Sequence, residues 1–269
     1  MKKTILFLVL VLSAAQAGGA PFSDPNKKKL TVAATTSNIG EIAKAVGGDK
    51  VDVEIMLKPL SCPSNVDITP SMAQRVSKSN LILSHKWEKW VDKLKREGGE
   101  RVRLFKQAET EGNWMIPYIH IRAAEEIMNM LSYLDIDNAK YYEEKYTRYA
   151  YNVRFAGEEA RKELAAAYGV KVISNDKIRD FLESFGFEVV AVYGKPEDLT
   201  AKKLKSLITE GKKNNVRIVV DNLQAGASTG RELAENLDAK QAVISNFVLG
   251  GSFVNTLKDN VSRLKQALK

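Results

Sequence analysis

The stretch DNAKYYEEKYTRYAYNVRFAGEEARKELAAAYG, from Asp137 to Gly169, decides the fold, because it predicts one helix long enough to span a whole domain. Its apolar side chains recur every three or four residues and form a single stripe: Tyr142, Tyr146, Tyr149, Val153, Ala156, Ala160, Leu164 and Ala167. Asp137 or Asn138 can cap its beginning, and Gly169 stands where a left-handed residue ends a helix. At 1.5 Å per residue, a helix from Ala139 to Tyr168 is about 45 Å long.

The segments on either side of this helix share one pattern of short apolar strands alternating with helices. Before it we expect strands at 30–35, 51–57, 81–83 and 102–105, and helices at 39–46, from Thr69-Pro70 onward and at 120–134. After it we expect strands at 170–173, 187–193, 216–220 and 242–244, and helices at 178–185, 199–210, 229–237 and 253–268. Helices of this length can cross over a parallel sheet.

The repeated pattern predicts an α/β protein with two similar lobes, each a parallel sheet flanked by helices, joined by one long rigid backbone helix. We expect an N-terminal lobe at 30–136, the linking helix at 137–169 and a C-terminal lobe at 170–269. The alternative, a long helix packed along one ordinary domain, is disfavoured because the chain looks similar before and after the helix.

The first residues have the pattern of a secretory signal peptide. Lys2 and Lys3 precede the apolar run Ile5 to Leu12, and the small-residue site Ala15-Gln16-Ala17 follows. We expect a signal peptide at 1–17 and a disordered leader at 18–29, and therefore an exported protein, periplasmic or otherwise extracytoplasmic. With no cysteine near Ala17, we expect that the protein is not a lipoprotein, while an uncleaved signal that acts as an anchor stays open.

Composition excludes some partners. The chain is 44% hydrophobic and 28% charged over 269 residues, enough for one large core or two small ones. Its net charge of +8 comes from charges that mostly alternate within helices, with no basic stripe interleaved with aromatic side chains. Nucleic acid is therefore not an expected partner. Cys62 is the only cysteine, so no disulfide can form within the chain.

Polar residues follow the expected strands, where ligands of such sheets bind. In open α/β sheets the binding crevice lies beyond the carboxyl ends of the strands, where the strand order reverses. Each of these residues could equally be a turn residue or a cap at the end of a strand. The candidates for one cleft between the lobes are Thr36, Ser64, His85, Met115, Asn175, Asp176, Asp221 and Ser245.

Several motifs together resemble one protein family. They are Ala45-Val46-Gly47-Gly48-Asp49-Lys50-Val51, the Pro63 loop leading into Thr69-Pro70, the segment from Trp87 to Leu94, the long helix, and Val172-Ile173 running into Asn175-Asp176. With these motifs, the chain resembles the zinc- and manganese-binding solute-binding proteins of ABC importers, the group of ZnuA, TroA and PsaA. The resemblance implies two lobes joined by the long helix, metal-ion cargo held between them, and an ABC permease in the membrane as partner.

The family's metal ligands do not carry over to this chain. The histidine of the first family motif, Asp-Pro-His, falls on Ser64, and that of the second motif, Asn-Pro-His, falls on Met115. The third ligand, histidine or glutamate, falls on Asn175, and the late carboxylate falls near Leu249. We therefore expect zinc and manganese to bind no tighter than about micromolar, because these side chains are poor ligands for both ions.

Three interpretations of the cleft remain open. In the first, it binds a soft metal such as copper(I) at a relocated site that uses Cys62 with His85 or His120. In the second, the cargo has changed to a small organic or chelated ligand held by hydrogen bonds and stacking, from Ser64, Asn65, Trp114, Asn175 and Asp176. In the third, the same fold serves as a non-transport surface protein or as an enzyme.

We do not expect an enzyme, because no nucleophile, base and orienting residue stand at a recognisable spacing, and no phosphate-binding glycine loop is present. A bound metal ion as cargo is the only cofactor-like species that the family resemblance suggests. We further expect a monomer.

Overall fold

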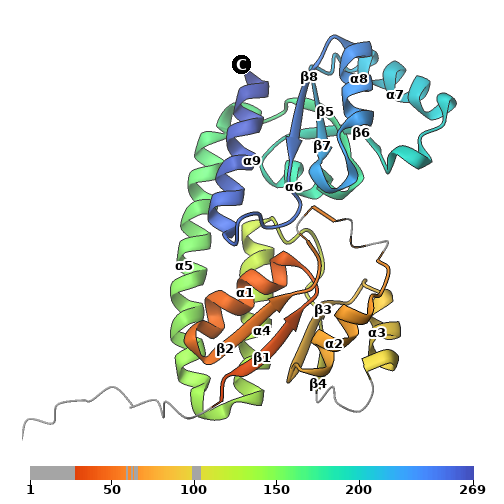
Figure 1. Ribbon diagram of the computed structural model, residues 1–269. Coiled ribbons are helices and arrows are strands. Elements are labelled where there is room, and N and C mark those ends of the chain that lie inside the picture. The colour runs from red at the N-terminus through yellow and green to blue at the C-terminus, as the bar shows by residue number, and fades with distance from the viewer. Residues whose placement is uncertain (1–27, 59, 62, 64–65, 99–103) are drawn as a thin grey trace, which may run out of the picture.

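The computed structural model describes residues 28–58, 60–61, 63, 66–98 and 104–269, and shows two lobes alongside one long helix (Figure 1). The N-terminal lobe contains β1 (Leu30–Ala34), α1 (Ser37–Gly47), β2 (Val51–Ile55), α2 (Pro70–Ser77), β3 (Leu81–His85), α3 (Trp90–Gly98), β4 (Leu104–Ala108) and α4 (Pro117–Leu134). The C-terminal lobe contains β5 (Lys171–Asn175), α6 (Arg179–Ser184), β6 (Glu188–Tyr193), α7 (Ala201–Lys213), β7 (Ile218–Asn222), α8 (Ser228–Leu237), β8 (Lys240–Ile244) and α9 (Phe253–Leu268).

Each lobe is built on a four-stranded sheet in which every pair of neighbouring strands is parallel. The strand order is β2-β1-β3-β4 in the first lobe and β6-β5-β7-β8 in the second. The two orders are the same topology repeated, so the prediction of two similar α/β lobes is confirmed. In both lobes the order reverses at the first strand, between β1 and β3 and between β5 and β7, and these reversals are where a ligand crevice is expected.

The linking helix is shorter than the sequence predicts. It is α5 (Ala139–Glu163), preceded by a 3-10 turn at Ile136–Asn138. A second 3-10 turn at Ala165–Ala167 replaces its expected last turn, so the α-helical part measures about 37 Å rather than about 45 Å. Gly169 does have a left-handed backbone, with φ of 73°, and its N–H donates to Gly186 O at 2.8 Å, which turns the chain into β5.

Helix α5 packs against both lobes, and its apolar stripe joins their cores. It contacts α1 and α4 of the first lobe and α9 of the second, which runs beside it in Figure 1. One hydrophobic cluster therefore includes strand residues of both lobes, such as Leu83 and Val220, together with Val153 of α5. This shared core fixes the two lobes relative to each other.

The predicted strand 102–105 corresponds to β4, which continues to Ala108, and residues 102 and 103 lie outside the described residues. The predicted helix 120–134 begins earlier, at Pro117, because proline suits the first turn of a helix. Helix α2 begins as predicted, with Thr69 accepting a hydrogen bond from Met72 N and Pro70 in first position. Within the part of the chain that the structure describes, no helix combines the length and the apolar character needed to cross a membrane. The predicted signal peptide at 1–17 lies outside the described residues.

Candidate functional site

The carboxyl ends of the two sheets face each other across the junction of the lobes. Asn38, in the first turn of α1 after β1, bonds to the segment that follows β8: its Oδ1 accepts from Val248 N at 2.7 Å and its Nδ2 donates to Asn246 O at 3.4 Å. Asn113, after β4, donates to Lys177 O, after β5, at 2.9 Å. The predicted cleft therefore corresponds to this junction, where the lobes touch at several points.

His85 lies at the end of β3, within the first lobe. Its Nε2 is 2.9 Å from Thr36 Oγ1, and its ring stacks on Trp87 at 4.9 Å and meets Trp114 edge-on at 4.3 Å. Burial lowers the pKa of His85 to about 3, so the imidazole is neutral at ordinary pH. One of the two ring nitrogens of His85 that could bind a metal ion is thus hydrogen-bonded to the Thr36 hydroxyl.

Glu88 is a buried carboxyl beside His85. Its Oε2 accepts from the Thr35 hydroxyl at 2.6 Å and from His85 N at 2.8 Å. Oε1 has no hydrogen-bond partner among the described residues. Burial raises the pKa of Glu88 to about 7, against the smaller opposing effect of these hydrogen bonds.

His120 is at the centre of a buried polar group that joins four helices. Its Nδ1 donates to Trp114 O at 2.8 Å, and its Nε2 lies 2.6 Å from the Tyr149 hydroxyl of α5. Tyr149 donates in turn to Glu41 of α1, whose other oxygen accepts from Phe253 N at the start of α9 at 3.4 Å. Both ring nitrogens of His120 are therefore engaged in holding the helices of the two lobes together.

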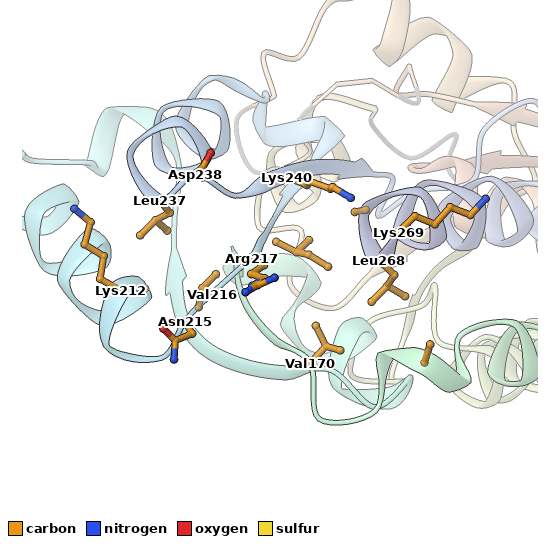
Figure 2. A pocket seen from close by; sticks show the side chains of 14 residues that line it. Val170, Lys212, Asn215, Val216, Arg217, Leu237, Asp238, Lys240, Leu268 and Lys269 are labelled. Atoms are coloured by element: carbon orange, nitrogen blue, oxygen red, sulfur yellow. The ribbon is translucent and has the colours of Figure 1, made fainter.

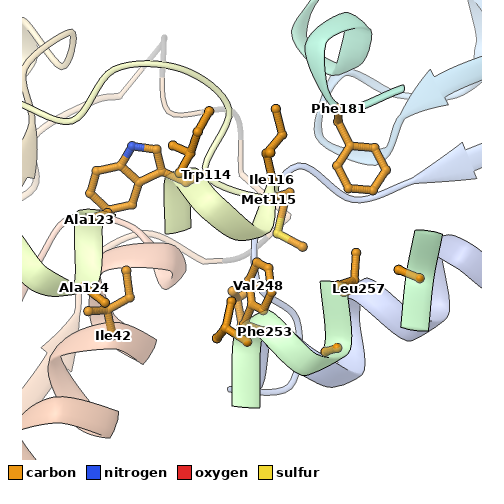
Figure 3. Close-up of a cluster of buried hydrophobic side chains, with 14 of the residues drawn as sticks. Ile42, Trp114, Met115, Ile116, Ala123, Ala124, Phe181, Val248, Phe253 and Leu257 are labelled. Atoms are coloured by element: carbon orange, nitrogen blue, oxygen red, sulfur yellow. The ribbon is translucent and has the colours of Figure 1, made fainter. Parts of the chain in front are cut away.

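Met115 lies inside the apolar core at the junction, where the family resemblance implies a metal ligand. It is 1% exposed and belongs to the same cluster as Phe181, Val248 and Phe253 of the second lobe. Figure 3 shows these side chains directed toward one another from the two lobes. A thioether in such surroundings serves as a packing group, since no charged donor accompanies it.

Asn175 and Leu249 also form hydrogen bonds that stabilise the fold of the second lobe. Asn175 Oδ1 accepts from Lys177 N at 3.1 Å, and its Nδ2 donates to Gly194 O at 3.2 Å. Leu249 N donates to the Thr256 hydroxyl at 2.8 Å, which ties the loop to α9. Neither side chain supplies a free donor atom to the junction.

The acidic candidates lie apart from one another. Asp176 is exposed and pairs with Lys177 at 3.1 Å. Asp221 is fully buried in the second lobe, where it accepts from the Tyr193 hydroxyl at 2.5 Å, Gly230 N at 3.1 Å and Gln241 Nε2 at 2.7 Å. Burial raises the pKa of Asp221, and these bonds anchor the first turn of α8.

The remaining candidates lie elsewhere or outside the described chain. Ser245 donates to Phe247 O at 2.6 Å and accepts from Gln224 at 3.0 Å, so its hydroxyl is satisfied. Trp114 is buried, and its Nε1 donates to Thr110 O at 3.0 Å. Cys62, Ser64 and Asn65 are not among the described residues. Within those residues, no group of three or more His, Cys, Asp or Glu side chains could hold a metal ion.

The first turn of α1 contributes buried polar groups to the junction that were not among the predicted site residues. Ser37 and Asn38 are both buried there, and Glu41 is buried one turn further along the helix. Ser37 lines a small hollow together with Lys58 and, from the other lobe, Phe247. The sequence signal for this turn is the polar run Thr35 to Asn38 between a predicted strand and a predicted helix, and Thr36 is the one predicted site residue within it.

A larger hollow of about 770 Å³ lies at the opposite end of the second lobe (Figure 2). Val170, Val216 and Lys240 in its lining stand at the amino ends of the strands, away from the junction. The last residues of α8 and α9, Leu237 and Leu268, also line it. Helix carboxyl ends repel anions, so the lysines and the arginine there complement the helix dipoles.

A comparison with protein-family models matches residues 32–267 to the family described as zinc-uptake complex component A, periplasmic (ZnuA). Among curated proteins, the chain is 22% identical over 245 residues to the metal ABC transporter substrate-binding lipoprotein SloC of Streptococcus mutans, covering 80% of each chain. It is 21% identical over 300 residues to the manganese ABC transporter substrate-binding lipoprotein PsaA of Streptococcus mitis, covering 98% of this chain and 97% of the relative.

These relatives correct one prediction. Both are named lipoproteins, which overturns the expectation that the protein is not a lipoprotein. That expectation depended on the absence of a cysteine near Ala17, in a segment that lies outside the described residues, and so had no structural support.

Solved structures share the fold. A crystal structure of ZnuA superposes with a TM-score of 0.79 at 17% identity, covering 90% of this chain and all of that one. The laminin-binding protein Lmb of Streptococcus agalactiae, described as having adhesin and metal-transporting activity, superposes with a TM-score of 0.77 at 18% identity, covering 89% and 100%. At these identities the likeness establishes the two-lobed architecture.

Proposed function

The chain belongs to the ZnuA family of periplasmic zinc-uptake components, and from this premise we propose that it is the extracytoplasmic solute-binding component of an ABC importer of the metal-ion uptake type. The observation that carries the proposal is the family match over 32–267. The pair of parallel sheets whose carboxyl ends meet beside α5 agrees with it. The protein would capture its cargo between the lobes and deliver it to an ABC permease.

The family is one of solute-binding proteins rather than enzymes, and the proposal includes no catalytic step. It includes the division of the chain inferred from the sequence: an export signal at 1–17, a leader at 18–29, lobes at 30–136 and 170–269, and the linking segment between them. It also includes a monomeric state, which light scattering coupled to size-exclusion chromatography measures directly.

The donor groups at the junction predict weak binding of the bare ion. Zinc sites need about four nitrogen, oxygen or thiolate donors within roughly 2.0–2.3 Å of the ion. Met115 is buried among apolar side chains, and both ends of the Asn175 amide are already bonded. We therefore expect zinc and manganese alone to bind no tighter than about micromolar.

A soft-metal site that uses Cys62 remains the alternative for the cargo. His85 is the more suitable partner for the thiolate, because His120 has both ring nitrogens engaged. Copper(I) is the ion that sulfur donors favour. If Cys62→Ser abolishes copper(I) binding measured by competition with a chromogenic chelator, this site holds the cargo. If the variant binds as the wild type does, Cys62 is not a ligand.

The experiment for the main proposal is elemental analysis of protein purified untagged from its native host, with mass spectrometry of anything released on denaturation. The proposal expects a transition metal in the native preparation, together with any molecule that accompanies it. A metal-free preparation that also fails to bind zinc, manganese or copper(I) in any form contradicts metal cargo. Nanomolar binding of bare zinc instead contradicts the ligand analysis of Met115 and Asn175.

A further inference from the structure

Three consecutive polar residues, Thr36, Ser37 and Asn38, stand at the start of α1 at the junction. The side chain of the middle residue, Ser37, makes no hydrogen bond within the described part of the chain. Thr36 Oγ1 accepts from Ile39 N and lies against His85, and the Asn38 amide bonds to the second lobe on both sides. Ser37 is only 4% exposed, yet its hydroxyl has no hydrogen-bond partner within the described part of the chain. A buried hydroxyl without a partner costs free energy, which a ligand could recover.

The same turn is the N-terminus of an eleven-residue helix with no acidic residue in its first turn. The first backbone N–H groups of a helix have no acceptor within it, and the helix dipole adds a partial positive charge there. Within the described residues no acceptor bonds to the N–H of Ser37 or Asn38. These donors and the Ser37 hydroxyl therefore provide a place for a negatively charged oxygen.

The size and the lining of the hollow beside Ser37 are compatible with a bound anion. The small hollow that it lines has room for about one water-sized atom, and Lys58 stands on its rim. None of the ion pairs among the described residues involves Lys58. Phe247, from the second lobe, contributes the apolar side of the hollow. An oxygen atom bound here would contact both lobes.

From these contacts we infer that the first turn of α1, with Ser37 and Lys58, is an oxyanion subsite of the cleft, so that the cargo is a metal ion complexed with an anionic oxygen ligand, a carboxylate or a phosphate. The inference rests on the proposed function, because it describes the cargo of the same cleft. It also accounts for how a cleft with few metal donors can hold a metal ion: the chelator supplies the ligands of the ion, and the protein binds the chelator.

The test is calorimetry on the full chain with four probes: zinc chloride, citrate, inorganic phosphate and the preformed zinc–citrate complex. We expect zinc–citrate to bind at least tenfold more tightly than zinc chloride. Ser37→Ala and Lys58→Gln should each weaken that binding three- to tenfold, since each removes one interaction with the anion. Titrations with citrate and with phosphate, each without zinc, distinguish the two sources of the anionic oxygen. The anion that binds more tightly shows whether the subsite prefers a carboxylate or a phosphate.

The controls are matched by position. Ser228→Ala changes a serine at the first position of α8, and Lys78→Gln changes an exposed lysine at the end of α2, both away from the cleft. Neither should alter affinity, and thermal melts of all four variants report that they are folded. Tight binding of zinc chloride that Ser37→Ala leaves unchanged overturns the inference and keeps the proposed function. Binding of citrate alone, with no binding of the zinc–citrate complex, keeps the subsite and contradicts metal cargo.

Discussion

The side-chain carbonyl of Asn38 in the N-terminal lobe accepts a 2.7 Å hydrogen bond from the backbone N–H of Val248 in the C-terminal lobe. Both residues are buried, at 2% and 0% exposure, so water cannot replace the bond. This contact lies at the carboxyl ends of the sheets, on the side of the molecule where cargo is expected. The lobes are therefore joined at the cleft as well as by α5.

Replacing Asn38 should lower the free energy of unfolding more than replacing an exposed asparagine does. Asn38→Ala leaves Val248 N–H buried without an acceptor, which costs about 1–3 kcal/mol in the free energy of unfolding. Asn236→Ala removes a bond from an exposed side chain to Glu232 O on the same helix and should cost much less. Urea unfolding followed by circular dichroism measures both. Equal losses for the two variants would mean that the Asn38 bond adds nothing.

The lobes should move little when cargo binds. The shared core, with Met115 against Phe253 and Val248, would have to separate for the lobes to rotate apart. Small-angle X-ray scattering should give nearly the same radius of gyration with and without cargo. A decrease like that seen when hinged domains close around a ligand would contradict this rigidity.

At Gly169 there is room for a side chain, but the left-handed backbone conformation there is unfavourable for any residue other than glycine. A Cβ there has no neighbour within 4 Å, yet φ is 73°, a conformation that costs other residues about 1 kcal/mol. Gly169→Ala should therefore lower the free energy of unfolding by about 1 kcal/mol. Gly194→Ala is the control, since the nearest contact of its Cβ is an ordinary 3.7 Å and its φ is not left-handed. If the two variants change the melting temperature equally, the left-handed conformation of Gly169 does not explain the loss of stability.

Glu88 should make stability depend on pH between about 4.5 and 7. Its pKa is raised from 4.5 in the unfolded chain to about 7, so the folded state binds the proton more tightly. Stability from this group is complete below pH 4.5 and is lost as pH rises to 7, by up to about 3 kcal/mol. Glu88→Gln lacks this titration, so the wild type should lose stability relative to the variant over that range.

The measurement for Glu88 is denaturant unfolding of both proteins from pH 4.5 to 7.5. His85, whose burial lowers its pKa to about 3, acts in the opposite direction, because its contribution is lost as pH falls below 6.5. It is present in both proteins and cancels in their difference. A difference that stays constant with pH would show that Glu88 does not titrate in this range.

Local sequence determined most of the elements. Thr69-Pro70 predicted the start of α2 because a capping hydroxyl and a proline in first position act within one turn, and Phe253 to Leu268 predicted α9 through its periodicity. The repeated alternation predicted both parallel sheets. The sequence could not predict where α5 ends, because the apolar pattern continues through Ala167 while the chain already turns toward β5.

The site was only partly predictable. The resemblance in sequence predicts that Met115 and Asn175 stand where the family has metal ligands, and this prediction required no structure. His85 and His120 were candidates because imidazole is a good ligand, but the sequence does not reveal that Thr36 and Tyr149 already occupy ring nitrogens. Those partners are brought close only by packing, from 49 and 29 residues away.

The sequence by itself therefore determined the family and the two-lobed fold, since each depends on residue identity or on short-range periodicity, while the loss of the usual metal ligands stays a prediction. Only the tertiary structure decided which polar groups are free. A hydrogen bond uses up a donor or an acceptor, and whether Asn38 is satisfied depends on Val248, 210 residues away, while Ser37 beside it has no described partner. The first turn of α1 became a candidate for binding for that reason.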